Sequence, residues 1–166
     1  MMLAVTIINT LALGFRFVVS IPFGRFADNR SYAKGFELGL IISAAAYICC
    51  IFTTQSTWYL IIGYTVLISV SLAGIESSNI NMVYNYVELD YIDDAMAIKA
   101  CIGGLFGFVS ALIAGKLVNV IEAKNPVIAG INIAPQQLLA IVSLALVVIA
   151  ILYVHFVISK QKVKRQ

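Results

Sequence analysis

Charged residues are scarce in this chain, and so are histidine and cysteine. Asp, Glu, Lys and Arg make up 11% of the 166 residues, whereas a soluble domain usually contains about 25%. The single histidine and the three cysteines (Cys49, Cys50 and Cys101) show no spacing typical of a metal site. The sequence also lacks a nucleophile–base pair, a phosphate-binding loop and a basic patch with interleaved aromatic residues. We therefore predict no metal, no cofactor, no enzymatic activity and no nucleic-acid partner.

Hydrophobic residues, in contrast, make up 61% of the chain, and the mean hydropathy is +0.98. A soluble core of this size cannot hide so much apolar surface, so the lipid bilayer must be its solvent. Backbone groups in lipid must be hydrogen-bonded within their own segment, which favours helices over open strands. The prediction is an all-α polytopic integral membrane helix bundle, a single transmembrane domain with five spans. These spans are expected at about residues 2–22, 36–54, 57–84, 95–120 and 137–159.

The basic residues predict the orientation of the five spans. The connector 23–35 holds three basic residues, and the tail 160–166 holds four. Four spans separate the two segments, so both lie on the same side of the membrane, and the excess of Lys and Arg makes that side cytoplasmic. The N-terminus is then outside. The acidic connector 85–94 is expected on the cytoplasmic side as well.

The connector 23–35 combines charge with a glycine, which permits a close approach or a tight turn next to the membrane. Its aspartate can face the N-terminus of the fourth span, where unpaired N–H groups lie. Its arginines can pair with the two aspartates that begin that span. Such a cluster would latch helices together on one side of the membrane, whereas the alternative is a positive-inside anchor with no mechanical role. The predicted latch residues are Gly24, Asp28, Arg30, Asp93 and Asp94.

The pattern Gly24-x-x-Ala27-Asp28-x-Arg30 resembles the loop motif of the major facilitator superfamily. That motif runs Gly-x-x-x-Asp-basic-x-Gly-basic-basic between the second and third helices and again, degraded, between the eighth and ninth. Gly24 and Asp28 match it, whereas Asn29 and residues 31–33 depart from it, as expected of the second copy. Residues 81–107 also resemble the tenth-to-eleventh helix region of bacterial members. The resemblance implies a partial fold of this superfamily, the C-terminal half with helices eight to twelve.

This resemblance implies secondary active transport of a small solute by alternating access in a bacterial plasma membrane. It gives the latch role to Asp28 and Arg30. It also implies that the N-terminal half, or a partner subunit in its place, is missing, so the chain is expected to be a fragment. The alternative is a small membrane scaffold or accessory subunit that transports nothing.

Glu76 is the carboxylate expected deepest within a span. A charge in lipid costs a few kcal/mol, so Glu76 must face protein or water. At helical spacing it shares a face with Thr65, Ser69 and Asn79. Such a polar stripe can line a solute cavity and carry a proton, or it can form structural hydrogen bonds to a neighbouring helix. Arg16, in the first span, can extend to the interface, pair with Glu76 or bind an anionic solute. The predicted solute or proton pathway comprises Glu76, Asn79 and Arg16.

Glycines in the fourth span predict close helix packing. Gly103 and Gly107 have the GxxxG spacing, and Gly104 lies beside them. Small residues of this kind let helices approach each other closely in lipid.

Overall fold

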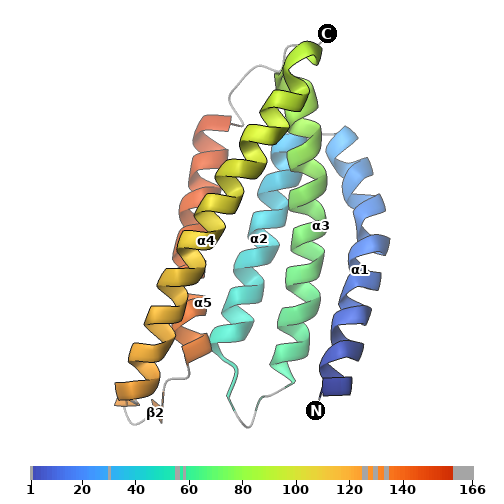
Figure 1. Cartoon of the computed structure of the whole chain (residues 1–166). Coiled ribbons are helices and arrows are strands. Elements are labelled where there is room, and N and C mark those ends of the chain that lie inside the picture. The colour runs from blue at the N-terminus through green and yellow to red at the C-terminus, as the bar shows by residue number, and fades with distance from the viewer. Residues whose placement is uncertain are drawn as a thin grey trace.

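The computed structural model describes most of the chain. The described residues are 2–29, 31–54, 57, 59–124, 127–128, 131–132 and 135–158. They form five long helices, arranged as a bundle whose successive helices run in alternating directions (Figure 1). The helices are α1 (Met2–Asn29), α2 (Tyr32–Ile51), α3 (Leu60–Tyr86), α4 (Ile92–Lys124) and α5 (Pro135–Tyr153).

Four short elements complete the described fold. A single turn of 3-10 helix, η2 (Leu89–Tyr91), leads into α4, and a π-helical turn, η3 (Val154–Ile158), continues α5. Between α4 and α5, β1 (Val127–Ile128) pairs antiparallel with β2 (Ile131–Asn132). The sequence did not predict this small hairpin. It lies in the connector between the last two predicted spans, where the sequence has residues typical of loops, Asn125-Pro126 and Gly130.

The helices are long and apolar enough to account for most of the predicted spans. Four segments meet the length and composition of a membrane-spanning helix, and they indicate a membrane protein. These helices confirm the predicted all-α bundle of apolar helices. The first predicted span, at residues 2–22, lies within α1, and that it crosses the membrane stays a prediction. The four segments are Tyr32–Ile51, Leu60–Tyr86, Leu89–Ile121 and Pro135–Ile158.

The helix ends differ from the sequence-based boundaries. The connector predicted at 23–35 is wrong in its first part, because α1 continues through Pro22 to Asn29. A proline removes one backbone donor and is tolerated where packing supports the helix. Here Phe23 and Ala27 are buried on the turns that follow it. Likewise α4 begins before and ends after the predicted span at 95–120, because a helix can continue into the polar interface beyond the apolar run.

The core of the bundle lies along α2 and α3. α3 packs against both α1 and α2, and the other side of α2 packs against α5. The central contact is built from small residues: Ser71 is fully buried, and its hydroxyl lies 2.7 Å from Ser43 Oγ and donates to the Gly39 carbonyl at 2.8 Å. These contacts bring the backbones of α2 and α3 close together.

α4 is the exception to this packing. It crosses the bundle at an angle (Figure 1), and every residue from 100 to 113 is exposed. The residues of this stretch are mostly apolar, so the helix presents a long unpartnered apolar surface within the described chain.

Candidate functional site

The two charged residues predicted for the solute pathway lie near the middle of adjacent helices. Arg16 is roughly 20 Å from either end of α1, and Glu76 is roughly 24 Å from the start of α3 and 15 Å from its end, at 1.5 Å per residue. α1 and α3 run in the same direction and pack against each other (Figure 1). The two residues therefore lie at similar depth, far from either end of the bundle.

The structure pairs these two side chains. Arg16 Nη2 donates a hydrogen bond to Glu76 Oε2, and the contact is also an ion pair. The sequence left this pairing as one of three interpretations of Arg16. Neither side chain is fully enclosed, since 32% of the Arg16 side chain and 55% of the Glu76 side chain are exposed. The pair thus joins α1 to α3 and remains accessible from one side.

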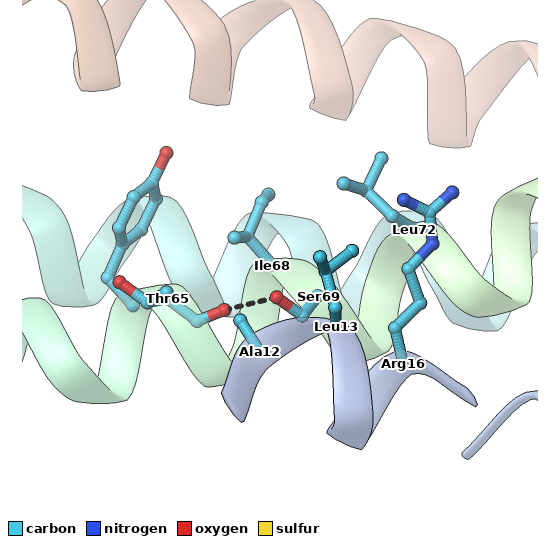
Figure 2. Close-up of a pocket in the computed structure, with 8 residues that line it drawn as sticks. Ala12, Leu13, Arg16, Thr65, Ile68, Ser69 and Leu72 are labelled. Carbon is cyan, nitrogen blue, oxygen red and sulfur yellow. Dashed lines mark hydrogen bonds between the residues drawn. The ribbon is translucent and has the colours of Figure 1, made fainter. Parts of the chain in front are cut away.

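A groove of about 490 Å³ lies next to this ion pair, between α1 and α3. Figure 2 shows Arg16 at one end beside Leu72, and Thr65 toward the other. Thr65 and Ser69, which the sequence placed on the same face of the helix as Glu76, both line it. The remaining lining residues are Ala12, Leu13, Tyr64 and Ile68.

The two groove hydroxyls already donate their hydrogens to the α3 backbone. Thr65 Oγ1 donates to the Ile61 carbonyl at 2.8 Å, and Ser69 Oγ donates to the Thr65 carbonyl at 2.7 Å (Figure 2). A hydroxyl has one hydrogen and two acceptor lone pairs. The groove therefore offers hydroxyl acceptors along α3 and a cationic donor, Arg16, at its end.

Asn79, the third residue of the predicted pathway, is half-buried one turn beyond Glu76 on α3. It is not among the residues that line the groove. Its part in a pathway stays a prediction.

The described latch residues lie toward the same end of the bundle, where α1 ends and α4 begins (Figure 1). Asp28 there accepts a hydrogen bond from the Tyr32 hydroxyl at 2.8 Å. Asp93 and Asp94 are exposed in the first turn of α4 and have no ion-pair partner among the described residues. Arg30 lies outside the described residues. The latch therefore stays a prediction.

The sequence made predictions for glycines in α1 and in α4. Gly24 lies inside α1, and an added Cβ there would have nothing within 4 Å, so among the described residues it makes neither the tight turn nor the close approach that the sequence left open. At Gly103, Gly104 and Gly107, an added Cβ would have nothing within 4 Å. These three glycines pack against no described helix of this chain, and their packing role stays a prediction.

The sequence missed a second contact between polar side chains of different helices. His155 Nδ1 lies 2.9 Å from Glu37 Oε1 and connects the π-helical turn η3 to α2. The sequence placed each residue near the cytoplasmic end of its own span. It gave no sign that the second and fifth helices pack side by side, which is what brings the residues together.

Among the described residues, no group of three or more His, Cys, Asp or Glu side chains is placed to hold a metal ion. The three cysteines are free, and two of them are partly buried.

The chain matches no protein-family model, and no curated protein and no solved structure is significantly similar to it.

Proposed function

We propose that this chain is part of a secondary transporter and that the groove between α1 and α3 belongs to the solute pathway. The observation that carries the proposal is the half-exposed Arg16–Glu76 ion pair near mid-helix, at the end of a groove. Ionisable residues at this depth are costly in lipid and typically mark solute or ion pathways. The exposed side of the pair must therefore face water or protein rather than acyl chains.

The ion pair can be formed or broken, and the proposed transporter would use both states. When Arg16 and Glu76 contact each other, they hold α1 against α3. When a solute or proton engages one partner, that contact weakens, and α1 can shift relative to α3. Alternating access needs such a contact, because a solute changes the conformation only through unequal interaction with the two states.

The resemblance of the 24–30 segment to the loop motif of the major facilitator superfamily supports the same proposal. In this view the chain supplies one wall of the cavity, and a missing N-terminal half or partner subunit supplies the other. The exposed apolar surface of α4 fits a chain that has such a neighbour. By the distribution of Lys and Arg, the end of the bundle with Arg25 and Lys34 is cytoplasmic.

Water access to the groove tests this function directly. In a background with the three native cysteines replaced by alanine, a single cysteine is placed at Ser69, which lines the groove. The matched control is a cysteine at Ala73, one turn further along α3, which is buried as Ser69 is but does not line the groove. We expect a membrane-impermeant thiol reagent to label Ser69→Cys in membranes and to leave Ala73→Cys unlabelled.

The same measurement separates transport from the alternative function, a membrane scaffold. In a scaffold, the Arg16–Glu76 pair serves only to join two helices, and the groove is closed by lipid or protein. Equal lack of labelling at Ser69→Cys and Ala73→Cys would favour the scaffold and rule out the proposed pathway.

A further inference from the structure

Arg16 has hydrogen-bond donors that the described chain does not use. Its guanidinium carries five N–H donors in a planar fork. Only Nη2 contacts a partner, Glu76, and Glu76 is the sole hydrogen-bonding partner of Arg16 among the described residues. An acceptor with two oxygens, such as a carboxylate, is the group that a planar guanidinium binds best.

The rest of the groove restricts what such a carboxylate can be attached to. Beyond Arg16, the groove walls are the apolar side chains of Leu72, Ile68 and Leu13. Further along lie the hydroxyl oxygens of Thr65 and Ser69, whose hydrogens are already donated to backbone carbonyls. These oxygens can accept from a solute but would repel a second anionic group. The groove therefore suits one carboxylate, a short apolar body and a neutral donor.

The volume of the groove agrees with a solute of this size. At about 490 Å³ it lies within the usual range of small-molecule sites, which is roughly 300–1,000 Å³. A long peptide or a large lipid would not fit within that volume.

We propose that the groove between α1 and α3 binds a small organic monocarboxylate through Arg16, in competition with the carboxylate of Glu76. The inference rests on the proposed solute pathway and names the class of its solute. An entering carboxylate takes guanidinium donors and adds a negative charge beside Glu76, which weakens the Arg16–Glu76 contact. Binding is thereby coupled to the contact that holds α1 against α3.

A matched set of probes tests the charge that the groove selects. The three probes are 6-hydroxyhexanoate, 1,6-hexanediol and 6-amino-1-hexanol, which share a six-carbon chain and a terminal hydroxyl but carry a negative, neutral or positive second group. Binding to the purified chain in lipid nanodiscs is measured by calorimetry at neutral pH. We expect the carboxylate to bind at least tenfold more tightly than the diol, and the ammonium compound to bind more weakly than the diol.

Two variants assign this selectivity to the two charged residues. Replacing Glu76 with Gln removes the competing charge and is expected to tighten 6-hydroxyhexanoate binding by about tenfold. The double variant Arg16→Gln/Glu76→Gln removes one positive and one negative charge, so the net charge of the pair stays zero. It is expected to bind all three probes equally.

The outcomes separate this inference from the proposed function. Equal binding of the three probes by the wild-type chain, or preference for the ammonium compound, would overturn the monocarboxylate proposal. So would unchanged selectivity in the double variant. In each case, labelling of Ser69→Cys would still show a water pathway, for a solute of another class. Carboxylate selectivity without that labelling would keep the binding site and remove the pathway.

Discussion

α2 and α4 carry the same glycine spacing, but among the described residues only α2 uses it for close packing. Gly35 and Gly39 on α2 lie so close to α3 that an added Cβ would come within 2.6 and 2.8 Å of its side chains. Gly103 and Gly107 on α4 have nothing within 4 Å of that position. The spacing shows that a helix face permits close approach. It does not show which helix approaches.

The difference follows from how each helix is placed. α2 lies between α3 and α5 and is packed on both sides, whereas the middle of α4 is exposed all round. In lipid an exposed apolar helix carries no hydrophobic penalty, because acyl chains solvate it as well as another helix does. The open glycines of α4 are thus stable as they are and remain available for a neighbouring helix.

Substitution at the paired glycines is the strongest test of this comparison. Gly39→Ala places a Cβ against Ile75, including its backbone nitrogen at 3.1 Å, so the two helices must move apart. We expect a loss of about 1–3 kcal/mol in the free energy of unfolding, as for other overpacked contacts. The measurement is reversible unfolding of the purified chain in mixed detergent micelles, followed by circular dichroism.

Gly107→Ala is the matched control for that substitution. The new methyl group meets no described atom, and alanine is the better helix former by roughly 1 kcal/mol in water. Unchanged or slightly increased stability is therefore expected. Equal destabilisation by the two variants would show that α4 packs tightly within this chain, and the contrast between the helices would be lost.

The second side of α2 can be weakened independently. Gln137 at the start of α5 donates from Nε2 to the carbonyls of Ile51 and Thr53, at 3.1 and 2.9 Å. Carbonyls at a helix C-terminus lack intrahelical partners, and these bonds supply them. Gln137→Ala is expected to cost about 1–2 kcal/mol of stability, whereas Gln136→Ala, at the exposed neighbouring residue, should cost little. Similar losses in both variants would contradict this role of Gln137.

A smaller effect is expected from the buried serines between α2 and α3. Ser71→Ala removes the contact with Ser43 Oγ and the bond to the Gly39 carbonyl. Hydrogen bonds between membrane helices contribute about 0.6 kcal/mol each on average, and the variant, which removes two, should lose about 1 kcal/mol. Ser110→Ala, on the exposed face of α4, is the control. A double-mutant cycle with Ser43→Ala would show no coupling if the two hydroxyls did not interact.

The sequence predicts features that depend on local segments better than features that depend on contacts between distant residues. Long apolar segments define the helices, because about 20 such residues leave the backbone no other form in lipid. The helix ends were less predictable, because Phe23 and Ala27 extend α1 by tertiary burial that no local pattern shows. The choice between the glycines of α2 and α4 depends on neighbours far along the chain.

The candidate site divides in the same way. Glu76 was identified from the sequence because a carboxylate among apolar residues is conspicuous, and helical periodicity placed Thr65 and Ser69 on its face. The partner of Glu76 remained open among three interpretations of Arg16, since only the packing of α1 on α3 brings the two together. Glu37 and His155 were not linked at all, because 118 positions separate them in the sequence.

The smallest effect that we expect on the packing of α2 comes from the contact between Glu37 and His155. The His155 side chain is 60% exposed, so solvent competes for the contact, and only its charged form makes an ion pair. We expect a coupling of about 0.2–0.5 kcal/mol in a double-mutant cycle of Glu37→Gln and His155→Gln, measured by unfolding in micelles. A coupling above that of the buried serines would mean that η3 is held to α2 chiefly by charge. A π-helical turn costs regular hydrogen bonding, and the contact would then explain why α5 ends in one.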